Sequence, residues 1–398
     1  MAILPDNAFD VCIVGAGPAG SATAIRLAIA GLSVLLVEQK KFPRDKLCGE
    51  FISPECLVHF DELGVLADIS SAGGVDLHQT VFYARSGRGM SVKSEWFGQN
   101  GSFALGLSRA EMDQRLLRRA REVGVEVRSE TVATGLVLER GRVTGVRLKS
   151  KDGSETSVTT KVTIDATGRT QALARRLQKS NEQRKRASHV AFKAHLRGAG
   201  TAPGTCEIFA YRGGYGGCNP IENDMYNLCF IASSADTRLR GSDAERVMRE
   251  VVFTNKRAAE TLHAARLASE WLAVPIERFG RGELVPASGL LTVGDAAAFV
   301  DPFTGSGILL ALESARIAAD VIAVSLRSES DFAVLAAEYR KKYATVFNTR
   351  LRVCSMLRNA AFVPLLADAT LSVLKLSSGL RRRIARATRF GAGPSLMV

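Results

Sequence analysis

The first forty residues contain two short apolar runs separated by an alanine-rich stretch. Val11–Val14 and Ser33–Val37 have the length typical of buried strands, and Ser21–Ala30 between them has the composition of a helix. The pattern predicts a strand–helix–strand unit, the building block of an α/β fold with a parallel sheet.

Three glycines and one carboxylate occupy the positions of this unit at which a dinucleotide would bind. Gly15 permits a tight turn after the first strand, Gly17 lets the main chain approach a pyrophosphate, and Gly20 lets the helix pack closely on the strand. The free amides at the helix N-terminus favour the same anion. Glu38 ends the second strand about 20 residues later and can accept hydrogen bonds from a ribose diol. The segment is a predicted dinucleotide cradle.

The rest of the chain alternates between helical and strand patterns in an order that separates two lobes. Helices are predicted over Arg109–Val123, Asp243–Leu267 and Gly307–Leu326, and strands over Val132–Leu138, Arg142–Leu148, Val158–Ile164 and Leu290–Val293, with strand-rich segments at Thr80–Phe103 and His189–Ile276. We expect an α/β protein with a Rossmann-like nucleotide-binding lobe, a β-sheet substrate lobe and C-terminal helices. Residues 1–77, 104–185 and 281–330 are assigned to the nucleotide lobe, 78–103 and 186–280 to the substrate lobe, and 331–398 to a basic helical segment.

Composition narrows the class of protein and its compartment. The 398 residues are 46% hydrophobic with a mean hydropathy of +0.06, which is typical of a globular protein. The seven cysteines are odd in number, scattered and without metal-ligand spacing, so we expect a reducing compartment and no metal site. No apolar run of about 18 residues occurs and the residues before Phe9 lack a basic signal region, which predicts a cytoplasmic protein without a membrane span.

The net charge of +13 is concentrated towards the C-terminus. Residues 331–398 hold twelve Lys or Arg against three acids, and five arginines fall within Arg381–Arg389, after the apolar stretch Phe362–Leu376. Two interpretations stay open: a helix that rests on an anionic membrane surface, giving peripheral membrane contact, or a solvated helix packed on its own domain. No nucleic-acid-binding motif is present, so no nucleic-acid partner is expected.

Three further motifs carry groups that a flavin dinucleotide requires. Thr163–Arg169 ends a strand in small residues, where the backbone can pass close to a ligand. Asp295 follows the strand Leu290–Val293 and can accept hydrogen bonds from a sugar-alcohol chain. Asp301–Gly307 opens a helix whose free amides can stabilise negative charge. A flavin requires all three of these features.

Together the motifs resemble those of FAD-dependent oxidoreductases of the glutathione-reductase-like type, in the branch with group A monooxygenases, geranylgeranyl reductases and flavin halogenases. GxGPAG at Gly15, LSR at Leu107, DATGRT at Asp165 and GDAAAFVDPFTGSGI at Gly294 occur in family order over roughly residues 9–320. The resemblance implies that FAD is held by Gly15, Gly17, Ala19 and Gly20 at the pyrophosphate, Glu38 at the adenosine ribose, Arg109 at the flavin side of the phosphates, Val132 at the adenine, Asp295 at the ribityl chain, and Gly305, Gly307 and Ile308 at the flavin pyrimidine edge.

The loop Pro43–Glu50 resembles the KxCGG or KxCGE loop of the geranylgeranyl reductase-like subgroup, in which the cysteine lies near the flavin ring. Cys48 is therefore the candidate catalytic residue, which tunes the flavin or contacts the substrate. The alternative is that Cys48 and Gly49 only allow the loop to approach the isoalloxazine.

Residues of the substrate lobe give weaker signals. His189, Lys193 and His195 share one face of an alternating segment, and they either donate protons in the pocket or are solvated or hydrogen-bonded within the lobe. Gly214–Pro220 aligns with the tyrosine–tryptophan–proline strand of the reductases but has no tryptophan, and Trp271 lacks the second tryptophan of the halogenase motif. These departures weigh against prenyl reduction and against halogenation.

The resemblance implies an FAD-dependent oxidoreductase with non-covalent FAD, and the reaction that we expect is that of a group A monooxygenase. NAD(P)H would reduce FAD as a transient donor, since only one nucleotide fingerprint is present, and O2 would then be used to hydroxylate an aromatic or polyketide-like apolar substrate. One alternative is a geranylgeranyl reductase-like enzyme that reduces double bonds of a prenyl or lipid chain, which the Cys48 loop and the basic tail favour. Another is a non-catalytic binding protein with this fold, similar to Rab GDP-dissociation inhibitors, which the presence of Glu38 and Asp295 disfavours.

Overall fold

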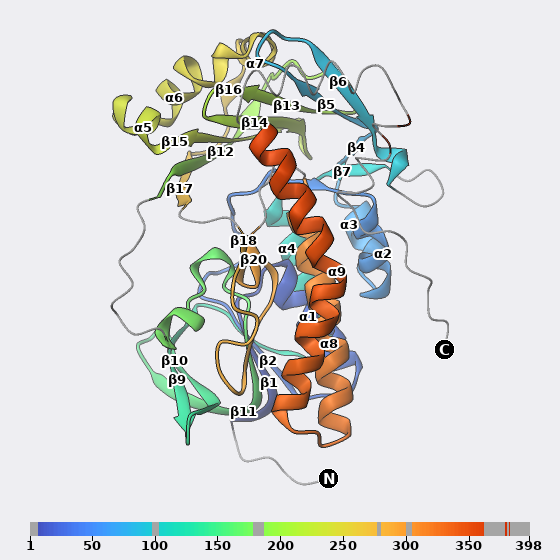
Figure 1. Ribbon diagram of the computed structural model, residues 1–398, viewed down its shortest axis with the longest axis vertical. Coiled ribbons are helices and arrows are strands. Elements are labelled where there is room, and N and C mark those ends of the chain that lie inside the picture. The colour runs from blue at the N-terminus through green and yellow to red at the C-terminus, as the bar shows by residue number, and fades with distance from the viewer. Residues whose placement is uncertain are drawn as a thin grey trace.

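The computed structural model describes residues 7–97, 103–177, 187–276, 280–299 and 305–361, together with positions 379 and 382. Two large sheets, one of seven and one of eight strands, follow one another along the long axis of the molecule (Figure 1). The predicted α/β fold class is confirmed.

The seven-stranded sheet places the sequence motifs at one edge. Its order is β8 (Glu126–Arg128), β2 (Val34–Val37), β1 (Ala8–Val14), β11 (Glu155–Asp165), β10 (Arg142–Ser150) and β9 (Thr131–Glu139), with β19 (Leu290–Thr292) paired to β11. Strands β2, β1, β11 and β19 run parallel, and Val14 lies in register with Val37 and Asp165, which in turn pairs with Thr292. The carboxyl ends of these strands therefore meet, and with them the glycine turn, Glu38 and Asp295.

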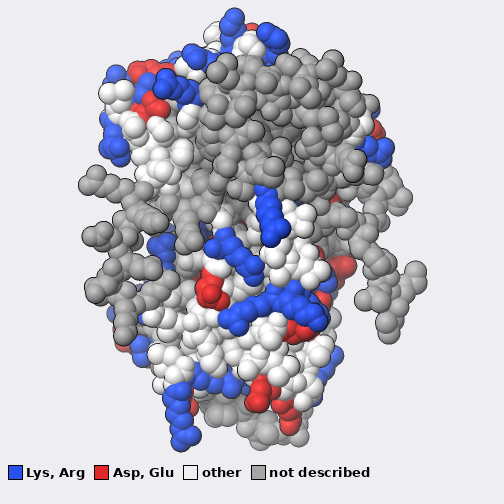
Figure 2. Space-filling view, viewed as in Figure 1, with Lys and Arg blue, Asp and Glu red and all other residues white. Residues whose placement is uncertain are grey.

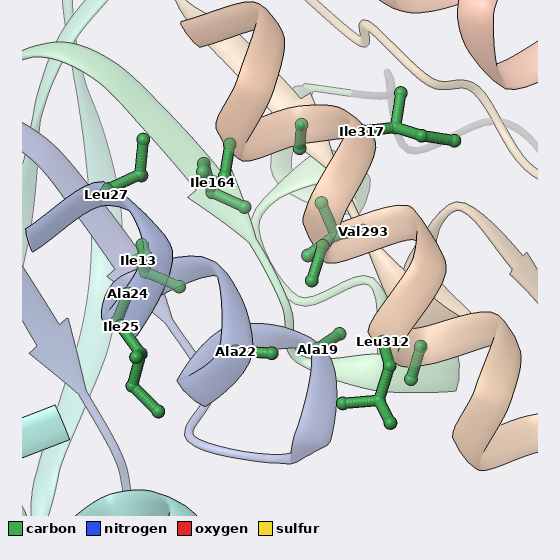
Figure 3. Packing of buried hydrophobic residues seen from close by; sticks show 14 of the residues in the cluster. Ile13, Ala19, Ala22, Ala24, Ile25, Leu27, Ile164, Val293, Leu312 and Ile317 are labelled. Carbon is green, nitrogen blue, oxygen red and sulfur yellow. The ribbon is translucent and has the colours of Figure 1, made fainter. Parts of the chain in front are cut away.

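Helices cover this sheet through a core rich in small residues. α1 (Pro18–Ile29) packs against α4 (Arg109–Glu122) and α8 (Gly307–Arg327), and α9 (Phe332–Ala361) packs on α8. Figure 3 shows Ala19 and Ala22 of α1 and Leu312 of α8 within this cluster. Because alanine adds only a methyl group, the helices come close enough to exclude water, which is the source of the lobe's hydrophobic stabilisation.

The eight-stranded sheet forms the other lobe. Its order is β16 (Arg266–Leu267), β12 (His189–Arg197), β15 (Tyr226–Ser233), β14 (Gly214–Pro220), β13 (Thr205–Tyr211), β5 (Gln79–Tyr83) and β6 (Gly89–Lys93), with β17 (Leu272–Ile276) paired to β12. One face packs Phe192, Phe209 and Phe230 against residues of α6 (Ala244–Glu250) and α7 (Lys256–Leu262). The opposite face carries a second apolar cluster, to which Leu47 and Phe299 are added from outside the sheet.

The single helix predicted over Asp243–Leu267 is wrong. The structure has α6, a 3₁₀ turn over Val252–Thr254, and then α7. Asn255 causes the break because its Oδ1 accepts a hydrogen bond from the Ala258 N–H, which caps α7. Its Nδ2 donates to the carbonyl oxygens of Ala84 and Ala210. Because the Asn255 side chain bonds both the N-terminus of α7 and the carbonyl groups of Ala84 and Ala210, the residue acts as a cap and the helix does not continue through it.

Shorter elements complete the described chain. They are β3 (Phe51–Ile52), α2 (Glu55–Glu62), α3 (Leu66–Ser70), β4 (Val75–Leu77), β7 (Ala104–Gly106), α5 (Ser234–Leu239), β18 (Gly280–Arg281) and β20 (Ala298–Phe299), with 3₁₀ turns at Ser94–Trp96, Gly168–Thr170, Ala174–Leu177 and Gly294–Ala296.

Helix α9 belongs to the predicted basic segment. Arg340, Lys341, Lys342 and Arg352 are exposed on it, and Figure 2 shows Lys and Arg interspersed with Asp and Glu on the face that carries α9. Within the described ranges, no helix is both long and apolar enough to cross a membrane. The arginines around residues 381–389 lie outside the described residues except Arg382, so membrane contact stays a prediction.

Candidate functional site

The turn between β1 and α1 is built as a backbone cradle. Gly15 has φ +106°, and a Cβ there would lie 2.4 Å from the carbonyl oxygen of Ala166. A Cβ on Gly20 would lie only 1.8 Å from the carbonyl oxygen of Gly15. Gly17 is different, since its backbone is extended and the nearest atom to an added Cβ would be Arg109 Nη2 at 3.7 Å. Two glycines are required by the fold, and the third borders open space.

Glu38 closes the cradle from the end of β2. It is 5% exposed, and its carboxylate accepts hydrogen bonds from the backbone N–H of Ala16 at 3.0 Å and of Lys40 at 2.9 Å. Arg44 Nη2 lies 3.4 Å from the same carboxylate. The structure thus places Glu38 beside the glycine turn.

Arg109 stands in front of Gly17 at the start of α4. Its guanidinium donates to both carboxylate oxygens of Asp113, at 2.8 and 2.7 Å, and Arg44 Nη1 lies 3.3 Å from Asp113. Burial opposes the charge of Arg109, but Asp113 outweighs it and raises the pKa of the guanidinium. Its positive charge is therefore permanent.

Asp295 lies near Arg109 and the glycine turn, although it comes from a much later part of the chain. Gly294, with φ +60°, packs so closely on α1 that an added Cβ would lie 2.7 Å from Ala19 Cβ, which brings Asp295 to the cradle. Burial raises the pKa of Asp295, while the positive charges of Arg169, Arg109 and Lys46 oppose that rise. Among the described residues, none donates a hydrogen bond to its carboxylate.

Positive charges at this place repel one another. Burial lowers the pKa of Lys46, and the charges of Arg44, Arg109 and Arg169 lower it further. Burial also lowers the pKa of Arg169. A diphosphate would relieve this repulsion, because it brings negative charge to a site with a cationic excess.

The start of α8 offers free amides near the Cys48 loop. Ser306 precedes the helix without capping it through its side chain, and a Cβ on Gly307 would meet no atom within 4 Å. Gly305, at φ +60°, packs towards Phe51, and Ile308 is buried. The preceding motif residues 301–304 lie outside the described residues.

Val132 is more distant from the core of the site. It is 44% exposed at the start of β9, where the N–H of Thr131 donates to the carbonyl oxygen of Glu38 at 3.0 Å. A surface hollow beside it is lined by Val127–Thr131 and Ser150–Asp152. This position suits the outer end of a dinucleotide, although the side chain of Val132 itself does not line the hollow.

Cys48 and Glu50 form a second centre, at the contact between the two lobes. Cys48 is half-buried, its carbonyl oxygen accepts from Asn227 Nδ2 at 3.2 Å, and its Sγ accepts from the N–H of Glu50 at 3.4 Å. Glu50 is fully buried, and its carboxylate accepts from Lys193 Nζ at 2.5 Å and from His195 Nε2 at 2.7 Å. The side chains of Lys193 and His195 are thus hydrogen-bonded, as one of the predicted alternatives had it, but their partner is the Glu50 carboxylate of the loop and not a residue of their own sheet.

Burial alone would raise the pKa of Glu50. The hydrogen bond and charge of His195, the charge of Lys193 and the N–H of Arg109 together outweigh burial and lower the pKa. Glu50 is therefore an anion that its neighbours stabilise. Sequence analysis named the loop but gave Glu50 no role, and its only signal was a charged residue at the entry to a buried strand.

The sheet face near Cys48 is apolar at one end and polar at the other. Ala191, Tyr215 and Ile231 form its buried apolar end, joined by Leu47 and Phe299. In the adjoining register positions lie Lys193, Cys229 and Gly217, and beyond them His195, Asn227 and Asn219. His189 lies at the other end of β12, where its Nδ1 is 2.9 Å from Ser188 Oγ.

Comparison with known proteins identifies the cofactor class. The family model described as an FAD-binding domain matches residues 8–349. The chain belongs to this family. It is an FAD-dependent oxidoreductase, as the resemblance of its motifs implied.

Relatives of this FAD-dependent oxidoreductase include reductases that match most of its length. Menaquinone reductase of Mycobacterium tuberculosis is 29% identical over 384 residues, covering 92% of this chain and 88% of that protein. Digeranylgeranylglycerophospholipid reductase of Methanosarcina acetivorans is 30% identical over 323 residues, covering 78% and 74%.

Solved structures share the fold of this oxidoreductase. The flavin-dependent brominase Bmp2 matches with a TM-score of 0.81 and 22% identity, covering 96% of this chain and 93% of that one. A geranylgeranyl bacteriochlorophyll reductase-like protein from Thermoplasma acidophilum matches with a TM-score of 0.77 and 22% identity, covering 96% of each chain.

The residues present fit FAD. The open space at Gly17 admits a pyrophosphate, four cationic side chains (Arg44, Lys46, Arg109 and Arg169) surround the site, and the carboxylate of Asp295 has acceptors for hydroxyl groups. The individual role of each candidate residue stays a prediction.

Proposed function

We propose that this FAD-dependent oxidoreductase reduces carbon–carbon double bonds in an isoprenoid-type chain. The observation that carries the proposal is the Cys48 loop, which lies on the substrate sheet where its apolar end (Ala191, Tyr215 and Ile231) meets its polar end. The two reductase relatives support it because their alignments extend over both lobes. Sequence analysis favoured a monooxygenase and kept this reductase as the alternative.

In this proposal, each part of the site has a distinct task. When bound, FAD would supply a hydride equivalent, and NAD(P)H or another donor would be the source of its electrons. Arg109, Arg44 and Lys46 hold the phosphates, Asp295 orients the ribityl chain, and the apolar end of the sheet excludes water and takes the prenyl chain. The carbon that does not receive the hydride takes a proton that comes ultimately from solvent water.

The monooxygenase stays the second candidate because β14 has glycine at Gly214, Gly216 and Gly217 and no tryptophan. The test is to incubate FAD-loaded protein with a menaquinone or a digeranylgeranyl lipid, with chemical reductant, with and without O2, and to follow product mass. A reductase adds two hydrogen atoms per double bond and continues under anaerobic conditions. A product that contains oxygen and forms only in air would overturn the proposal in favour of hydroxylation.

We also propose that exposed basic residues of α9, including Lys341, Lys342 and Arg352, contribute to contact with an anionic membrane that contains such a lipid. Flotation with anionic and neutral vesicles tests this. Recovery with anionic vesicles that falls at high salt is expected, and equal recovery with both kinds would contradict it.

A further inference from the structure

Glu50 occupies an unusual place for a charged residue. It is fully buried and has φ +50°, the left-handed region that non-glycine residues seldom adopt. Such a conformation persists only where the surroundings determine it, and it is enriched at functional sites. Five hydrogen bonds from three segments of the chain hold Glu50 here.

These contacts join the two lobes. Glu50 accepts from Lys193 and His195 of β12, which are 143 and 145 residues away in the chain. Its carboxylate also accepts from the N–H of Arg109 at 2.9 Å, and its carbonyl oxygen accepts from Asn219 Nδ2 and the N–H of Leu107, each at 3.3 Å. The substrate sheet and the start of α4 thereby both hydrogen-bond to Glu50.

Cys48 lies two residues before Glu50 in the same loop. The N–H of Glu50 donates to Cys48 Sγ at 3.4 Å, and the Arg109 side chain also interacts with Cys48, so Glu50 and the start of α4 together position the thiol. Among the described cysteines, Cys48 alone is half-buried and the others are buried. A group that fixes the Glu50 backbone therefore also fixes the accessible thiol at the lobe contact.

We propose that Glu50, Lys193 and His195 form a positioning cluster that latches the Cys48 loop to the substrate sheet and sets the position and accessibility of the Cys48 thiol. They act through Cys48 and the loop. This role goes beyond the proposed function and does not depend on which substrate the enzyme takes.

A second buried carboxylate provides the matched control. Glu207 is also fully buried, and it pairs with Arg257 at 2.6 Å and Thr261 at 2.7 Å. All three residues belong to the substrate lobe, and none contacts the Cys48 loop. Glu207→Gln therefore disturbs a buried ion pair of the same kind without disturbing the latch.

The experiment measures alkylation of Cys48 by iodoacetamide in the FAD-loaded protein, followed by peptide mass spectrometry, together with thermal unfolding. Glu50→Gln and Lys193→Met are each expected to accelerate alkylation about ten-fold, because each removes the buried ion pair between the loop and β12 and the loop opens. Glu207→Gln is expected to lower the melting temperature and leave the alkylation rate unchanged.

A double variant separates positioning from stability. Glu50→Gly combined with Lys193→Met leaves neither buried charge and removes the backbone restriction at φ +50°, so a melting temperature near that of the wild type is expected, with alkylation still accelerated. If this folded double variant and both single variants alkylate at the wild-type rate, the latch is refuted. Because alkylation needs no substrate, a failure of the proposed reductase activity leaves this result interpretable.

Discussion

The cradle at Gly15–Gly20 and the Cys48–Glu50 centre are built in opposite ways. In the cradle, the main chain carries the chemistry, and the required glycines lie within six residues of one another. At the second centre, side chains carry it, and the side-chain partners of the Glu50 carboxylate, Lys193 and His195, lie more than a hundred residues away. A cofactor common to many proteins can be held by a local backbone motif, whereas a site specific to one enzyme depends on long-range packing.

Their electrostatics differ as well. Around the cradle, burial and the positive charges of Arg44, Arg109 and Arg169 lower the pKa of Lys46, which prepares the site for an anion. At the second centre, Glu50 is already paired with Lys193 and His195 and its pKa is lowered. The cradle therefore has an excess of positive charge that an anion can neutralise, whereas the charge of Glu50 is already neutralised by its partners.

The largest effect is expected from Gly20→Ala. The new Cβ would lie 1.8 Å from the Gly15 carbonyl oxygen, so the unfolding free energy should fall by about 3 kcal/mol. Gly17→Ala is the matched variant, because its Cβ would make only an ordinary van der Waals contact, with Arg109 Nη2 at 3.7 Å, and apoprotein stability should change by less than about 1 kcal/mol. Its FAD affinity should still fall about ten-fold. Denaturant unfolding and FAD titration measure both, and equal losses of stability would contradict the assignment.

Asp295→Ala should weaken FAD binding next most strongly. Loss of an ionised acceptor for ribityl hydroxyls is expected to cost about 1.5 to 3 kcal/mol, roughly ten- to hundred-fold in affinity. Asp320→Ala is the control, because Asp320 is exposed and pairs with Arg316 on the outer part of α8. Equal FAD dissociation constants for wild type and Asp295→Ala would refute the role of Asp295.

A smaller and pH-dependent effect separates the second centre from the cradle. Because the pKa of Glu50 is lowered on folding, its stabilisation is present above the unfolded value of about 4.3 and is lost as pH falls through the folded pKa. The stability difference between wild type and Glu50→Gln should therefore shrink below about pH 4.3. Urea unfolding from pH 7 downwards tests this, and a difference that stays constant with pH would contradict the linkage.

The smallest effect is expected where neither centre is involved. Asn255→Ala removes the cap of α7 and should lower the unfolding free energy by about 1 to 2 kcal/mol. FAD affinity and Cys48 alkylation should stay at wild-type values, since Asn255 contacts β5 and β13 on the helical side of the sheet. A change in either property would show that the two faces of the sheet are coupled.

The parts of the fold that depend on local pattern could be predicted from the sequence. β1, α1, β2, α4 and α8 lie close to their predicted ranges, because apolar period and glycine position are properties of adjacent residues. The break at Asn255 could not be predicted, since the groups that it bonds at Ala84 and Ala210 come from distant strands.

The candidate site divides along the same line. The proximity of Gly15, Glu38 and Asp295 follows from parallel strands whose carboxyl ends share an edge. The role of Glu50 depends on which strand of the second sheet faces the loop. The pattern of apolar and polar residues along the chain does not predict that contact. Lys193 and His195 were recognised as sharing a face, but their partner was not.

The position of β19 has a consequence for how the protein is made. Strand β19 adds to the first sheet beside β11, and the hydroxyl of Tyr339, on α9, donates to the carbonyl oxygen of Thr292 at 2.7 Å. During translation the glycine turn is synthesised before most of the substrate lobe, and the strand and helix that complete its own lobe are synthesised after it. The nucleotide lobe can therefore complete its sheet only once the intervening substrate lobe has been made.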